Sequence, residues 1–80
     1  MKNYPRLQVQ CDLKGLPVQL KYGRSGLRVR KIMEMWKDTG CWWKEESEKA
    51  FYRLLCHDNS VREIFLDLGN REWFLYKTYD

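Results

Sequence analysis

The sequence predicts an all-β domain, and the spacing of its apolar residues is the main reason. Segments near both ends of the chain alternate apolar and polar residues with a period of two, as half-buried strands do. Gly, Pro and Asn stand between these segments, where turns are expected. The 80 residues make one domain, residues 1–80, with a thin core. The expected architecture is a small, strongly bent antiparallel sheet or an SH3-like barrel of about five or six strands.

The first strand is expected over residues 7–13, "LQVQCDL". Leu7, Val9, Cys11 and Leu13 alternate with polar residues there, so they are expected to share the face that packs on the core. Free cysteine is common in such positions, because it behaves as a small apolar side chain.

The next two strands are expected to form a hairpin around the loop "GRSG", residues 23–26. Residues 18–22 alternate before this loop, and residues 27–36 alternate after it. The alternation slips by one position near Arg30 and Lys31, which indicates a β-bulge.

Two segments fit a helix as well as a strand. Val29, Ile32, Met33 and Trp36 also have helical spacing, so a short helical turn near residues 31–38 is an alternative there. The segment 45–57 likewise fits either structure. Its apolar residues can be read with a period of two or as one face of a short helix.

The last third of the chain, residues 61–79, predicts a long hairpin broken once at Gly69-Asn70. With Leu66 opposite Trp73, one face takes Ile64, Leu66, Trp73 and Leu75, and the other takes Phe65, Phe74 and Tyr76. A small barrel needs only one apolar face. The second face is therefore expected either to be covered by another segment or to form an exposed binding patch.

The adjacent pair Trp42-Trp43 is the most concentrated aromatic feature. Because neighbouring side chains project differently, one ring is expected to enter the core. The other is free to cover the second face of the C-terminal hairpin or to contact a partner. The candidate protein-interaction residues are Trp42, Trp43, Phe65, Phe74 and Tyr76.

Positive charge is concentrated in the first part of the chain. Residues 1–31 hold eight Lys or Arg and one acid, a net +7, whereas residues 32–80 hold seven against ten, a net −3. A four-residue hairpin loop would place Lys21 directly opposite Arg28, a like-charge pair that an anion could relieve. Basic β-ribbons bind nucleic-acid backbones, although cations also serve simply to protect sheet edges. The candidate nucleic-acid-binding residues are Lys21, Arg24, Arg28, Arg30 and Lys31.

Catalytic and metal chemistry are not expected. Cys11, Cys41, Cys56 and His57 could make a Cys3His set, but only Cys56 and His57 are close in sequence. Adjacent residues on a strand point to opposite faces, so both could not easily reach one ion. We expect no metal, no cofactor, no small-molecule substrate and no enzymatic activity. Odd, widely spaced cysteines and the lack of a signal or membrane segment predict a cytoplasmic protein with no membrane contact.

The stretches "LPVQLKYGRSGLRVRKIMEMWKDTGCWW", "AFYRLL" and "REIFLDLGNREWFLYKTYD" resemble a family of small bacterial domains of unknown function over residues 16–80. The matching positions are Pro17, Gly23, Arg28-Val29, Ile32-Met33, Trp36, Trp42-Trp43, Tyr52-Arg53-Leu54, Asp67, Trp73 and Asp80. Leu27 departs from the family, which usually has an aromatic residue there, and Met33 departs from its usual Leu.

Members of that family are often encoded beside, or fused to, Y-family polymerase-like proteins of inducible mutagenesis cassettes. The resemblance therefore implies a DNA-repair setting, and it favours strands over helices for residues 27–36 and 50–57. It supplies no catalytic motif.

These observations lead to the expectation of a non-enzymatic accessory binding module in a translesion or DNA-repair polymerase system. Its basic hairpin would contact single-stranded or duplex DNA, and its aromatic patch would contact a protein such as a Y-family polymerase-like partner. The alternative is a purely structural protein–protein interaction domain without nucleic-acid affinity.

Overall fold

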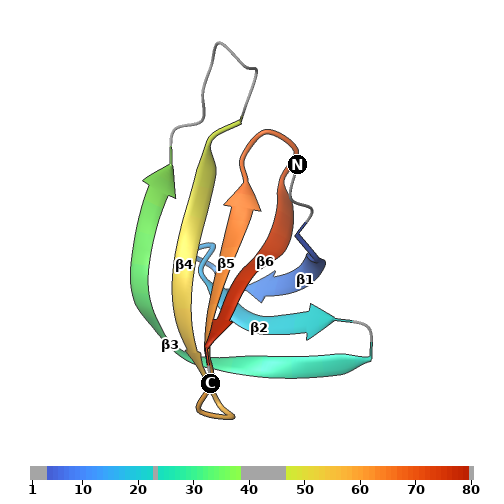
Figure 1. The fold of residues 1–80 in the computed structure, drawn as a ribbon, viewed down its shortest axis with the longest axis vertical. Helices are drawn as coiled ribbons and strands as arrows, with labels where there is room; N and C mark the ends of the chain where they lie inside the picture. Colours follow the sequence, from blue (N-terminus) through green and yellow to red (C-terminus); the bar gives the residue numbers. More distant parts are fainter. Residues whose placement is uncertain (1–3, 23, 39–46, 80) are drawn as a thin grey trace.

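The computed structural model describes residues 4–22, 24–38 and 47–79, and it confirms the all-β prediction. Six antiparallel strands follow one another around a closed barrel (Figure 1). Their bounds are β1 Arg6–Cys11, β2 Pro17–Tyr22, β3 Ser25–Asp38, β4 Lys49–Cys56, β5 Val61–Asp67 and β6 Glu72–Tyr79. The two ambiguous segments form strands over Ser25–Asp38 and Lys49–Cys56, so the alternative of a helical turn near residues 31–38 is wrong. No helix long and apolar enough to cross a bilayer occurs in the described residues.

The first strand is shorter than the alternation predicts. It ends at Cys11, where the register with β2 shifts, and a turn follows. In that turn the Oδ1 atom of Asp12 accepts hydrogen bonds from the backbone N–H groups of Lys14 and Leu16. Leu13 lies in this turn and Cys11 lies beyond the register shift, so both are exposed, and their predicted place on the core face is wrong.

The β2–β3 hairpin is also tighter than predicted. Leu20 pairs with Leu27, and Lys21 pairs with Gly26 rather than with Arg28. The expected like-charge pair is therefore absent, because Ser25 and Gly26 belong to the ladder and not to the loop. The difference is two positions, and a shift of two keeps every side chain on its predicted face.

Strand β3 is long because it serves two neighbours in turn. Its first residues pair with β2, and the residues from Val29 onward pair with β4. Register shifts occur between Val29 and Lys31 and again between Ile32 and Glu34. The first shift is the predicted bulge, and the second has no counterpart in the predictions. Such irregularities bend a strand, which lets β3 turn the corner of the barrel.

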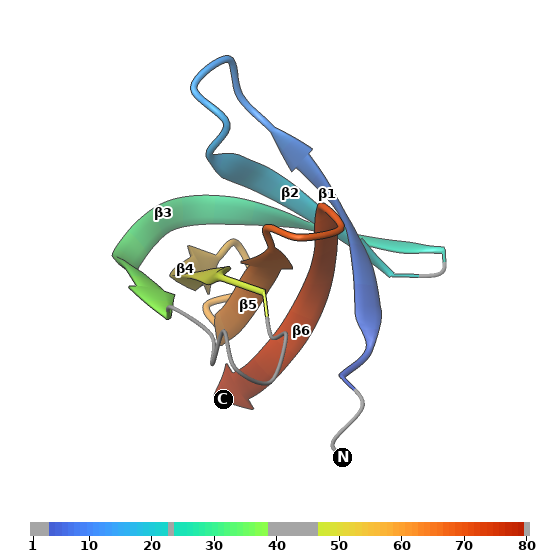
Figure 2. The same ribbon diagram turned by 90° about the horizontal axis from the view of Figure 1, so that it is seen from above.

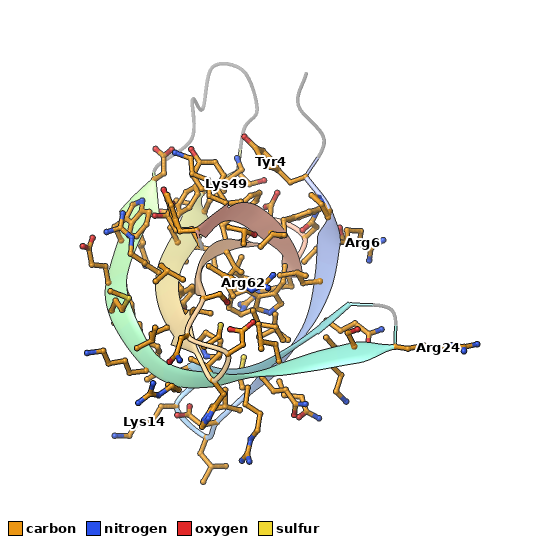
Figure 3. All side chains as sticks on the ribbon, turned by 60° about the horizontal axis from the view of Figure 1, so that its bottom comes forward. Tyr4, Arg6, Lys14, Arg24, Lys49 and Arg62 are labelled. Atoms are coloured by element: carbon orange, nitrogen blue, oxygen red, sulfur yellow. The ribbon has the colours of Figure 1, made fainter. Side chains whose placement is uncertain are left out.

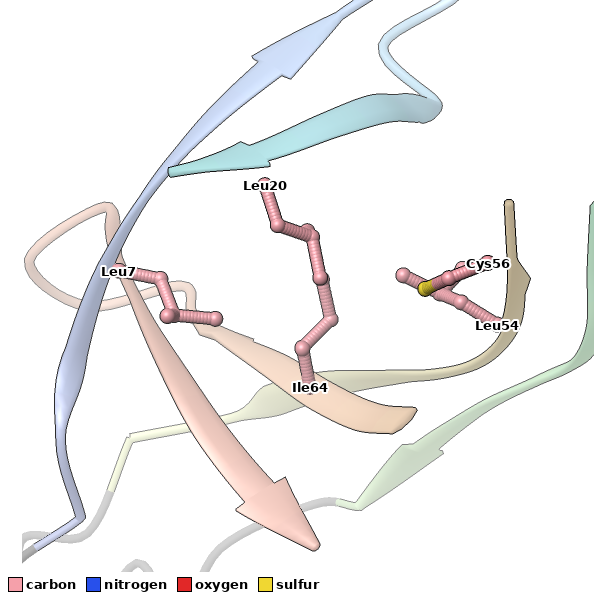
Figure 4. Close-up of a cluster of buried hydrophobic side chains, with 5 residues drawn as sticks. All are labelled: Leu7, Leu20, Leu54, Cys56 and Ile64. Atoms are coloured by element: carbon pink, nitrogen blue, oxygen red, sulfur yellow. The ribbon is translucent and has the colours of Figure 1, made fainter. Parts of the chain in front are cut away.

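The core lies inside the barrel. Leu20, Leu54, Cys56 and Ile64 are fully buried there, and Leu7 joins them (Figure 4). The partly buried side chains packed around this cluster are Val9, Leu27, Val29, Ile32, Tyr52, Trp73 and Leu75. Burying each large apolar side chain contributes about 1.5–3 kcal/mol relative to leaving it exposed.

The C-terminal hairpin has the predicted register. Leu66 lies opposite Trp73, and Ile64 lies opposite Leu75. Ile64, Trp73 and Leu75 pack in the barrel core as expected for one face. Phe65, next to Ile64 on β5, therefore points out of the barrel with the second apolar face of the hairpin.

Candidate nucleic-acid interface

The β2–β3 hairpin projects from the barrel as an arm, seen clearly from above (Figure 2). We call the outward side of residues 17–31 the basic ribbon. Leu20 and Leu27 point to the core, so the alternating neighbours point away from it. Arg24 stands at the tip and extends away from the rest of the molecule (Figure 3). Of the predicted nucleic-acid residues, Arg24, Arg28, Arg30 and Lys31 are exposed and Lys21 is partly buried.

The charge of the basic ribbon is unopposed by acids of its own segment. Residues 13–33 contain six Lys or Arg and no Asp or Glu. One of these cations is positioned by the barrel, because Arg30 Nη1 donates a hydrogen bond of 2.9 Å to Asn59 Oδ1. Asn59 has a positive φ of 68° in the β4–β5 turn. The structure thus places Lys21, Arg24 and Arg28 on the arm, and Arg30 and Lys31 at its base, where β3 pairs with β4.

A row of aromatic rings covers the outer face of the barrel across four strands. Trp36 lies opposite Phe51, Phe51 opposite Phe65, and Phe65 opposite Phe74. The ring centroids along this row are 5.4, 5.2 and 5.1 Å apart. Tyr4 adds an edge contact to Phe65 at 5.5 Å. Two rings from other segments, Tyr4 and Phe51, therefore pack on the second apolar face, and Phe65 in that face is only 4% exposed.

A row of alternating charges lies beside the aromatic row. Glu34 lies opposite Arg53, Arg53 opposite Glu63, and Glu63 opposite Lys77. Arg53 Nε and Nη2 both reach Glu63 Oε2 at 2.8 Å, and Arg53 Nη1 reaches Glu34 Oε1 at 3.0 Å. The hydrogen bond to Glu63 is the main reason that the pKa of Arg53 is raised. The Arg53 guanidinium also lies 5.9 Å from the centre of the Trp36 ring, so it links the two rows.

Members of both rows line a groove of about 440 Å³. Its walls come from the C-terminal halves of β3 and β6, the strands that flank β4 and β5. We call it the outer groove. It is lined by Trp36, Lys37, Asp38, Phe51, Arg53, Glu63, Tyr76, Lys77 and Tyr79.

Of the predicted protein-interaction residues, Phe65, Phe74 and Tyr76 pack together on the outer face of the barrel, where Phe65 contacts both other rings. Phe65 is buried, whereas Phe74 and Tyr76 are half-buried, and only Tyr76 lines the outer groove. Trp42 and Trp43 lie outside the described residues. The outer-groove residues that sequence reasoning missed come mainly from β3 and β4, where the alternation was ambiguous. The available signal was the run of matched opposite charges, which only the register reveals.

The cysteines and the histidine do not gather into a metal site in the part of the chain that the structure describes. Cys56 is fully buried in the barrel core, while His57 is exposed in the turn that follows. Burial raises the pKa of the Cys56 thiol, which keeps it protonated and unreactive. Burial, reinforced by Asp12, also raises the pKa of Cys11. Cys41 lies outside the described residues.

Comparison of the chain with family models, with curated proteins and with solved structures finds no match.

Proposed function

We propose that this chain is a non-enzymatic module that binds the backbone of single-stranded nucleic acid through the basic ribbon. One observation carries the proposal: five cations lie on the arm that projects from the barrel and at its base, and this segment holds no acid. Lys and Arg that neutralise phosphates release condensed counterions, which drives binding without reading the base sequence. Sequence preference at this surface is therefore expected to be slight.

The geometry of the basic ribbon sets the expected strength. Three or four phosphate contacts on a single strand give a slope of about −2 to −3 for the logarithm of the binding constant against that of the salt concentration. Backbone contacts of this kind give dissociation constants of roughly 10⁻⁴ to 10⁻⁶ M at physiological salt. Affinity in that range suits a module that is tethered to, or works beside, a protein that itself binds DNA.

The setting proposed for the module is a translesion polymerase system. Support comes from the resemblance of residues 16–80 to small domains associated with Y-family polymerase-like proteins, and from no other observation. In that setting the basic ribbon would hold the single-stranded template beside the polymerase-like partner.

The test is fluorescence anisotropy with a labelled single-stranded 12-mer, titrated at several salt concentrations. The triple variant Lys21→Ala, Arg24→Ala, Arg28→Ala should lose binding. It spares Arg30, whose hydrogen bond to Asn59 holds the arm. A matched control, Arg6→Ala, Lys14→Ala, Lys49→Ala, lowers the net charge from +4 to +1 equally but leaves the basic ribbon intact. The control should retain most of the wild-type affinity.

Equal losses in both triple variants would mean that net charge alone attracts the oligonucleotide, and the basic ribbon would then have no special role. A duplex of the same sequence should bind no more tightly than the single strand. The second candidate function is a purely structural interaction domain, favoured by the exposed side chains of Met33 and Met35 on β3. That function predicts no titration even at low salt.

A further inference from the structure

The outer groove contains a buried carboxylate, that of Glu63, and only one of its two oxygens accepts hydrogen bonds from the described residues. Glu63 is 3% exposed, and both bonds from Arg53 fall on its Oε2 atom. Its Oε1 atom has no hydrogen-bond partner among the described residues. Glu63 lines the outer groove, so a ligand there could supply one. A buried carboxylate oxygen without a donor is costly, so a donor supplied by a ligand would be favoured there.

The walls of the outer groove offer flat surfaces beside that acceptor. Tyr79 is 42% exposed and packs against no other aromatic ring in the described part of the chain. Trp36 and Tyr76 stand in the walls, and both are partly exposed. Rings of this kind are stacking platforms for unpaired bases. The volume of about 440 Å³ falls within the roughly 300–1,000 Å³ of small-molecule sites.

Charge and position favour nucleic acid as the occupant over an apolar peptide. Among the described residues, the lining holds three cations, Lys37, Arg53 and Lys77, against two acids. The outer groove also continues from the basic ribbon, because both lie on β3. A strand rises about 3.3 Å per residue, so Trp36 lies at most about 17 Å beyond Lys31. One oligonucleotide could therefore contact both surfaces.

We propose that the outer groove holds one unstacked base of a single strand, with Tyr79 as the stacking surface and Glu63 Oε1 as the acceptor for an exocyclic amine of that base. This inference rests on the proposed function, since the backbone of the same nucleic-acid strand would lie on the basic ribbon. Arg53 positions Glu63, and its remaining N–H groups can donate to a ring nitrogen next to the amine. Cytosine and adenine present that combination of an amine and an acceptor, whereas uracil does not.

The experiment compares three labelled 12-mers of equal length and charge: oligo-deoxycytidine, oligo-deoxyuridine and an abasic backbone. A stacked base should tighten binding of the cytidine oligomer over the abasic one by roughly 5- to 150-fold. Cytosine should also exceed uracil by at least about 5-fold, because the two differ in the group offered to Glu63. Tyr79→Ala should remove most of the difference between the cytidine and abasic oligomers, while Tyr79→Phe keeps it. Leu13→Ala, at an exposed apolar residue away from the outer groove, should change nothing.

The outcomes separate this inference from the proposed function. If the abasic and cytidine oligomers bind equally, with normal salt dependence, the outer groove takes no base and the basic ribbon remains the binding surface. A peptide-binding groove would give that same result. If Tyr79→Ala leaves the base dependence unchanged, the stacking site lies elsewhere and the inference is wrong. Equal binding of cytidine and uridine oligomers would remove the role assigned to Glu63. If no oligomer binds at low salt, the proposed function itself fails.

Discussion

The outer aromatic row should stabilise the domain about as much as the barrel interior does. Phe65 is the test residue, because it is only 4% exposed and contacts four rings at centroid distances of 5.1 to 6.1 Å. Truncating such a phenylalanine to alanine costs about 3–5 kcal/mol. A domain of this length has a total free energy of unfolding of about 4–12 kcal/mol. Phe65→Ala is therefore expected to remove much of the stability of the domain.

The milder change Phe65→Leu keeps most of the apolar volume but removes the ring–ring contacts. We expect it to cost less than Phe65→Ala but more than a surface change, since each aromatic pair contributes about 0.5–1.5 kcal/mol beyond the area that it buries. Urea denaturation followed by circular dichroism measures both variants. Tyr79→Ala serves as the control, because an exposed residue should change stability by no more than about 0.5 kcal/mol. A loss below about 1 kcal/mol for Phe65→Ala would refute the reasoning, because Phe65 would then not be part of a packed cluster.

Three further predictions follow from local geometry. Gly69→Ala should destabilise the domain by about 1–3 kcal/mol in the same denaturation assay, because a Cβ there would lie 2.9 Å from the Cβ of Ser47. The Cys56 thiol should react with a thiol reagent only on unfolding, because it is buried. Burial also raises the pKa of this thiol, so its contribution to stability is full below about pH 8.5 and is lost as the pH rises through the folded-state pKa. Hydrogen bonds from the Ser60 side chain and backbone lower the pKa of Asp58. The contribution of Asp58 to stability is therefore present at neutral pH and is lost on acidification through that lowered pKa. In a Ser60→Ala variant titrated by NMR, the pKa of Asp58 should be lowered less.

The fold was predictable where one face of a strand is apolar and the other polar. The C-terminal hairpin shows this best: the apolar residues fix which side chains face each other, and Leu66 does lie opposite Trp73. The β2–β3 hairpin shows the limit. Leu20 and Leu27 lie on the same face whether the loop has two residues or four, so the apolar periodicity could not distinguish the two loop lengths. A four-residue loop would pair Lys21 with Arg28, whereas the two-residue loop pairs Lys21 with Gly26.

The outer groove was predictable only in part, for a different reason. Phe65 and Tyr76 were placed on a second apolar face, but their neighbours on β3 and β4 were not identified. Two register shifts in β3 break the alternation that would have placed Trp36 on that face. The Arg53–Glu63 pair depends on which residues meet across strands, and single-strand patterns do not contain that information.

The packing of the outer face also decides which aromatic residues are available for binding. Phe51 and Phe65 sit in the middle of the row, on β4 and β5, and their neighbours bury them. A ligand could reach them only by separating rings that stabilise the domain. Tyr79 stands in a wall of the outer groove, where exposure is greater and few contacts would be lost. Aromatic content alone therefore does not mark a binding surface: substitutions in the centre of the row should act on stability, and substitutions at Tyr79 should act on binding.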